Sequence, residues 1–60
     1  MKIKVGDSIK TLNGEVKVTG IFKDANDDLY FRSISEGQEN TESAFYFKKR
    51  LREPLDEIEI

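Results

Sequence analysis

Hydrophobic and polar residues alternate along most of the chain, as they do in β-strands that bury one face. Three segments in the first third of the sequence follow this pattern: Lys2–Val5, Ser8–Leu12 and Glu15–Thr19. The last two flank Asn13–Gly14, a dipeptide typical of the type I′ turn because both central residues of that turn need a positive φ. We therefore predict a β-hairpin over residues 8–19.

A two-residue loop at Asn13–Gly14 fixes which residues of this hairpin lie opposite one another. It pairs Thr11 with Val16, and it places Lys10 opposite Lys17, where two like charges repel weakly. The same register gives the hairpin an inward face made of Ile9, Thr11, Val16 and Val18.

The pattern predicts three more strands in the rest of the chain: Leu29–Ile34, Thr41–Phe47 and Leu55–Ile60. Gly20 interrupts the alternation of the hairpin's second strand, so we expect a β-bulge or a sharp bend there. Asp24–Asp28 is rich in turn-forming residues and is expected to join two strands.

The segment between Ser43 and Pro54 allows two interpretations. The adjacent aromatic residues 45–47 favour a strand with Phe45 and Phe47 inside and Tyr46 outside, followed by a helical turn over Phe47–Leu51. The competing interpretation is a helix from Ser43 to Arg52, which we weight less. Pro54 ends a helix in either case.

The two ends of the chain carry matching patterns. Lys2–Val5 alternates lysine with apolar residues, and Glu57–Ile60 alternates glutamate with isoleucine. Side by side, the two segments would bury their apolar residues and pair opposite charges. We expect this pairing to cover the edges of the sheet and to close it into a barrel.

The composition restricts the chain to a small number of functions. Sixty residues allow a single domain over 1–60, and a core this small gives only a few kcal/mol of net stability. Without Cys or His the chain has no disulfide framework and no ordinary zinc, haem or iron–sulfur ligands, so no cofactor is expected. The net charge of −2 favours neither nucleic acid nor an anionic membrane, and the lack of long apolar runs predicts a cytoplasmic protein.

Several short motifs together resemble a known architecture. Val5-Gly6-Asp7-Ser8-Ile9, then Asn13-Gly14-Glu15-Val16 and Gly20-Ile21, resemble the opening of KOW-type and Tudor-type barrels, and Phe45-Tyr46-Phe47 with Leu51 and Pro54-Leu55 resembles the ending of many short bacterial and phage accessory proteins. This resemblance implies an all-β fold, an SH3-like five-stranded small barrel with a short helical turn before the last strand. The chain lacks the second glycine that usually follows the KOW hairpin, having Val16-Lys17-Val18 there.

Catalysis is not expected. No motif surrounds the serines, and a barrel of this size has no room for a small-molecule substrate. Asp24–Asp28 resembles the start of a calcium loop, but Leu29 replaces the required glycine and Ser35 replaces the bidentate glutamate. No metal ligands are therefore assigned.

Exposed aromatic and basic residues point to a binding function instead. We predict a protein partner contacted by Tyr30, Arg32 and Tyr46, with Lys48, Lys49, Arg50 and Arg52 at the rim. The alternative is a KOW/Tudor-like barrel that contacts single-stranded RNA or DNA, because basic residues beside aromatic rings suit phosphates and bases. A third interpretation is an assembly component whose exposed strand edge pairs with itself.

Overall fold

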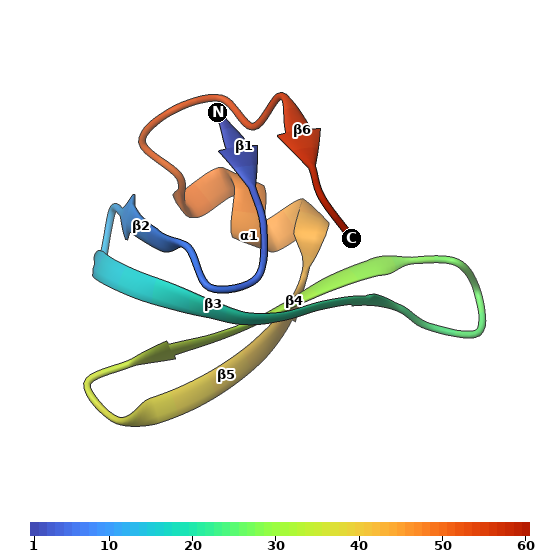
Figure 1. The fold of residues 1–60 in the computed structure, drawn as a ribbon, viewed down its shortest axis with the longest axis horizontal. Coiled ribbons are helices and arrows are strands. Elements are labelled where there is room, and N and C mark those ends of the chain that lie inside the picture. Colours follow the sequence, from blue (N-terminus) through green and yellow to red (C-terminus); the bar gives the residue numbers. More distant parts are fainter.

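Strands dominate the computed structural model, which describes all 60 residues. The main sheet consists of β2 (Ser8–Thr11), β3 (Gly14–Lys23), β4 (Leu29–Ser35) and β5 (Gln38–Ser43), antiparallel and in the order β2-β3-β4-β5. The other elements are β1 (Lys2–Ile3), α1 (Ala44–Arg50) and β6 (Glu57–Ile58). They lie together on one side of the main sheet (Figure 1).

The hydrophobic core lies between these two layers. Its buried hydrophobic residues are Ile3, Ile9, Val16, Val18, Phe31 and Phe47. Phe31 of β4 and Phe47 of α1 stack with their ring centroids 4.5 Å apart, and both are fully buried. We call the face of the main sheet that carries Phe31 the inner face and the opposite one the outer face. Alternation along β4 puts Tyr30 and Arg32 on the outer face, as predicted.

The first hairpin has the predicted faces but a different register. Ile9 pairs with Val16 and Thr11 with Gly14, two residues away from the prediction, so the loop consists of Leu12 and Asn13. Gly14 has a φ of 114°, whereas Asn13 has no positive φ, so Asn13–Gly14 does not form a type I′ turn. A shift of two residues keeps each side chain on its face, and the predicted burial is confirmed.

This shift also changes the charges that face one another in the hairpin. Lys10 lies opposite Glu15 instead of Lys17. The predicted repulsion between two lysines is therefore wrong, and an opposite-charge pair takes its place.

The turn between β4 and β5 has the geometry expected for the first hairpin. Glu36 and Gly37 form a two-residue loop between Ser35 and Gln38, with φ values of 52° and 78°. Positive φ at both central residues identifies a type I′ turn.

Gly20 interrupts the pairing of β3 with β4. The register shifts between Val18 and Gly20, which confirms the predicted bulge. Beyond the bulge, β3 continues to Lys23, so that the β3–β4 hairpin extends past the helical layer (Figure 1).

The predicted strand Thr41–Phe47 is confirmed over residues 41–43 and wrong over residues 44–47. Strand β5 ends at Ser43, and Ala44–Arg50 is helical, close to the alternative that we weighted less. A helix turns Ala44 and Phe47 toward the core, because residues three apart share a face. Phe45 therefore points outward and is 61% exposed, contrary to its predicted burial.

The predicted pairing of the chain ends is confirmed. β1 and β6 pair in parallel, with Lys2 opposite Glu57 and Ile3 opposite Ile58, and Lys2 Nζ lies 3.6 Å from Glu59 Oε2. The N-terminal ammonium group also donates to Asp56 Oδ2 at 2.7 Å.

The expected closed barrel is not formed. β1 and β6 pair only with each other and make a separate two-stranded sheet, so the main sheet keeps its two ends. Closure would require this pair to hydrogen bond to both edge strands, β2 and β5, and neither β1 nor β6 pairs with them. The fold is thus mostly β, with one short helix and an open sheet.

Candidate binding surfaces

The structure separates the predicted contact residues into two groups. Tyr30 and Arg32 belong to the outer face of β4, whereas Tyr46, Lys48 and Lys49 belong to α1, which covers the inner face. Tyr30 contacts the ring of Phe22 and Tyr46 contacts the ring of Phe45, and no aromatic contact joins Tyr30 to Tyr46. The two groups are therefore described as separate surfaces.

The first surface, here called the sheet patch, consists of Phe22, Tyr30 and Arg32. The rings of Phe22 and Tyr30 stack with centroids 5.8 Å apart and an interplanar angle of 13°. The Arg32 guanidinium lies 5.8 Å from the centre of the Phe22 ring, and its Nε lies 3.9 Å from Glu39 Oε2. A Cβ atom on Gly20 would lie 2.7 Å from an Arg32 nitrogen, so the bulge glycine leaves room for this arginine.

Tyr30 lies beside the acidic turn that joins β3 to β4. The Asp24 carboxylate organises this turn, since its Oδ1 accepts from the backbone N–H groups of Asn26 at 2.8 Å and Asp28 at 3.0 Å. The predicted turn is thus confirmed. The negative charge of Asp24, with a smaller contribution from Asp28, raises the pKa of the Tyr30 phenol above its ordinary value of 10.0.

The second surface, here called the helix patch, consists of Phe45, Tyr46, Lys48 and Lys49. The two aromatic rings meet edge to face with centroids 5.2 Å apart, and each residue is 61% exposed. Lys49 Nζ lies 4.1 Å from the centre of the Phe45 ring and 5.8 Å from that of Tyr46. Lys48 and Lys49 form no ion pair with an acidic side chain.

The two arginines that were expected at the rim are tied into the fold. Arg50 forms an ion pair with Glu42, and its carbonyl accepts from the Leu12 N–H at 2.8 Å. Arg52 Nε donates to the Thr11 carbonyl at 3.3 Å. The two hydrogen bonds fix the chain at the end of α1 to the first hairpin, and the ion pair fixes Arg50 to β5.

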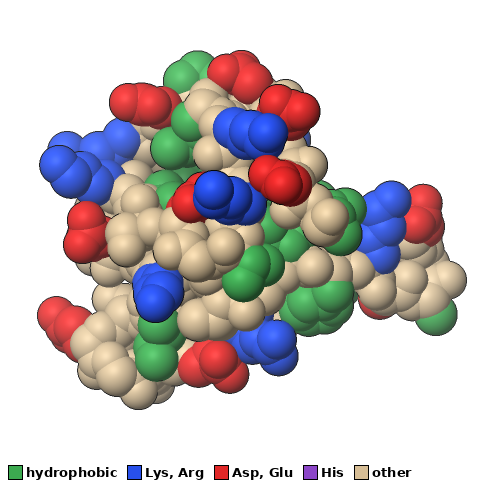
Figure 2. Space-filling model, viewed as in Figure 1, with side chains coloured by type: hydrophobic (Ala, Val, Ile, Leu, Met, Phe, Trp, Pro, Cys, Tyr) green, Lys and Arg blue, Asp and Glu red, His purple; other side chains and the backbone are tan.

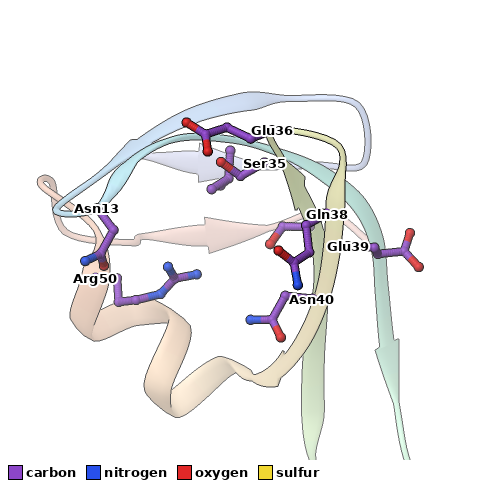
Figure 3. Close-up of a pocket in the computed structure, with 9 residues that line it drawn as sticks. Asn13, Ser35, Glu36, Gln38, Glu39, Asn40 and Arg50 are labelled. Atoms are coloured by element: carbon purple, nitrogen blue, oxygen red, sulfur yellow. The ribbon is translucent and has the colours of Figure 1, made fainter.

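A polar cavity of about 330 Å³ lies between the main sheet and the end of α1. Its lining residues are Asn13, Val16, Ser33, Ser35, Glu36, Gln38, Glu39, Asn40 and Arg50. Figure 3 shows the side chains of Gln38, Asn40 and Arg50 directed into this space, while the carboxylate of Glu39 points away from it. Arg50 Nε is the one buried side-chain nitrogen or oxygen without a hydrogen-bond partner.

Sequence reasoning missed two features of these surfaces. The exposure of Phe45 could have been found from the helical spacing of Ala44, Phe47 and Leu51, which assigns those three residues to one face. The cavity had no sequence signal, because its lining comes from two turns, three strands and a helix end that are far apart in the chain.

The overall charge pattern does not single out one face. In the view of Figure 2, basic and acidic side chains are interspersed, and hydrophobic side chains reach the surface between them. None of the helical structure has the length and apolar character needed to cross a membrane.

Comparisons with known proteins add no family to this description. No protein-family model matches the chain, no curated protein matches it, and no solved structure matches it.

Proposed function

We propose that the protein is a non-catalytic binding module that docks on a larger protein as an accessory or regulatory factor. The observation that carries this proposal is the exposed pair Phe45–Tyr46 on the outward side of α1. Both rings are 61% exposed in a domain that buries only six hydrophobic side chains. Aromatic residues of this kind dominate the binding energy of protein interfaces when a partner covers them.

The lysines of the helix patch define the chemistry of the partner. Lys49 lies over both rings, and Lys48 and Lys49 lack acidic partners within the chain. A partner surface with an apolar centre and acidic residues around it would therefore complement this patch. In this proposal Arg50 and Arg52 support the helix end, and the sheet patch with Tyr30 and Arg32 is a second, separate contact.

The alternative function is binding of single-stranded RNA or DNA. Exposed rings beside unpaired lysines are also the arrangement on which nucleic-acid bases stack. The net charge of −2 argues against it, because the charge of the whole molecule repels phosphates.

A capture experiment tests the protein-binding proposal. Extract from cells that produce the protein is passed over the immobilised wild-type domain, a Phe45→Ala/Tyr46→Ala variant, and a Leu12→Ala/Ile60→Ala control. The control removes similarly exposed apolar groups elsewhere, since Leu12 is 66% and Ile60 76% exposed. A protein retained by the wild type and the control but lost with the helix-patch variant supports the proposal; equal retention by all three domains contradicts it.

An NMR titration separates the alternative. Mixed-sequence single-stranded RNA and DNA are added to the labelled domain at low and then moderate salt. Shifts that cluster at residues 45–49 and weaken with salt would favour nucleic-acid binding. The absence of shifts at low salt leaves the protein partner.

A further inference from the structure

The two edge strands of the main sheet differ in how they are covered. β2 is bridged by the chain itself, through Thr11 and Leu51, and the Leu12 N–H donates to the Arg50 carbonyl. β5 pairs only with β4 and has no neighbour on its other side. Its six residues include no lysine and no proline, and its pairing with β4 contains no bulge. Lysine, proline and β-bulges are features by which proteins usually protect an exposed edge, and β5 has none of them.

The turn that precedes β5 determines which backbone groups face the free edge. In a two-residue hairpin the pair next to the loop, here Ser35 and Gln38, exchanges both hydrogen bonds, and such pairs alternate along the strands. Asn40 therefore also turns its backbone groups toward β4. The N–H and C=O groups of Glu39 and Thr41 consequently point to the free edge.

The charges on β5 are already neutralised within the chain. Glu39 lies beside Arg32 on the outer face, and Glu42 pairs with Arg50 on the inner side. The other four residues of the strand are Gln38, Asn40, Thr41 and Ser43, all uncharged. A second strand can therefore approach this edge without meeting an unpaired charge.

We propose that β5 pairs in antiparallel fashion with β5 of a second copy of this chain, so that two four-stranded sheets form one continuous sheet. The two-fold axis passes between the two Asn40 residues. In this register Glu39 of each copy lies opposite Thr41 of the other. The two residues exchange hydrogen bonds through the N–H and C=O groups that point to the free edge. Opposing residues share a face of the sheet, and no two like charges are opposed.

The polar cavity supports the same register. Asn40 and Gln38 line the cavity, and pairing about Asn40 places Gln38 of the second copy opposite Glu42, the ion-pair partner of Arg50. The carboxamide of Gln38 can accept a hydrogen bond from an arginine N–H and donate one to the carboxylate of Glu42. The second copy thus brings a suitable partner to the Arg50 side chain, whose Nε is buried without one.

The contact is confined to one strand edge, so it is smaller than the interface of a permanent dimer. We expect association between micromolar and millimolar protein concentration. It uses a different surface from the helix patch, so the outcome for either proposal does not decide the other.

Sedimentation velocity over this concentration range tests the association. The wild-type domain should shift from monomer to dimer. Thr41→Pro should stay monomeric, because proline removes an N–H that points to the free edge while the bonds to β4 remain. Thr41→Val, which keeps that N–H, should still dimerise. A wild-type domain that remains monomeric, or a dimer that persists in Thr41→Pro, would overturn the proposal.

A charge exchange at Asn40 tests the register even if the proline variant does not fold. Asn40→Asp and Asn40→Lys each place two like charges together at the axis, so neither variant should self-associate. An equimolar mixture of the two should form a heterodimer, and added salt should weaken it. Self-association of either variant alone, or a mixture that remains monomeric, would rule out pairing about Asn40.

Discussion

Two stacked aromatic pairs use neighbouring residues of β4 but lie on opposite faces of the main sheet. Phe31 stacks on Phe47 with centroids 4.5 Å apart, inside the core. Phe22 and Tyr30 stack at 5.8 Å on the outer face, where Phe22 remains 38% exposed. The inner pair joins two layers of the molecule, whereas the outer pair joins two strands that are already hydrogen bonded.

This difference separates burial from stacking as a source of stability. Edge or face contact between rings contributes about 0.5–1.5 kcal/mol, while removing a buried phenylalanine costs about 3–5 kcal/mol. We therefore expect the inner pair to maintain the fold and the outer pair to remain available for contacts. The predictions below test that division.

The largest loss of stability is expected from removing the C-terminal end of the chain, which packs against the core. Deletion of residues 56–60 removes β6, and with it Ile58, which packs against the core beside Ile3. The N-terminal ammonium group also loses Asp56. We expect the truncated chain to be unfolded, measured as loss of the thermal transition in circular dichroism; an unchanged transition would show that the terminal pair is dispensable.

The next largest loss of stability is expected from replacing one of the two phenylalanines of α1. Phe47→Ala should destabilise the domain by about 3–5 kcal/mol, because Phe47 is fully buried against Phe31. Phe45→Ala is the matched control, and its 61% exposed ring should make its effect less than about 1 kcal/mol. Chemical denaturation of both variants measures the difference. Equal losses would mean that Phe45 packs in the core, as the sequence alone had suggested.

These two phenylalanines also show how far the sequence could predict the fold. Alternation identified most of the strands, the buried face of the first hairpin and the bulge at Gly20, because a half-buried strand repeats every two residues. Residues 45–47 are aromatic, so strand propensity outweighed a helical pattern of only seven residues. In the helix Phe47 packs on Phe31, and that contact lies outside any local window of sequence.

Long-range features were predictable only where the sequence repeats a pattern. The matching lysine and glutamate faces of the chain ends revealed the β1–β6 pair, but they could not show that this pair remains a separate sheet. Asn13–Gly14 also allows a turn in which glycine alone has a positive φ, so the dipeptide did not fix the register. The cavity around Arg50 depends on the assembled fold and left no local signal.

A smaller effect is expected on the outer face. Phe22→Ala removes the ring shared by Tyr30 and Arg32, so it should cost the stacking energy of about 0.5–1.5 kcal/mol plus a burial term that the 38% exposure of Phe22 reduces, in total less than Phe47→Ala. Denaturation under the same conditions checks this value. A loss comparable to that of Phe47→Ala would mean that the outer pair also holds the sheet together, and the division between the faces would be wrong.

The smallest effect on the unfolding free energy comes from ionisation of Tyr30 and is confined to alkaline pH. The Asp24 carboxylate raises the pKa of Tyr30, so the folded domain holds the phenol proton more tightly than the unfolded chain. The resulting stabilisation is fully present below the ordinary tyrosine pKa of 10.0 and is lost as the pH rises through the higher, folded-state pKa. Unfolding free energy should therefore fall above this pH and be unaffected by Tyr30 near neutrality.

Replacement of Asp24 isolates the cause of this shift. Asp24→Asn removes the charge but keeps the side-chain oxygen that accepts from Asn26 and Asp28, so the turn should persist. The Tyr30 ring signal, followed by NMR as the pH is raised, should titrate at lower pH in this variant, and Asp28→Asn should have a weaker effect because Asp28 contributes least. An unchanged titration in Asp24→Asn would mean that the turn does not act on Tyr30. With the predicted result, the Tyr30 phenol stays uncharged to a higher pH than an ordinary tyrosine does.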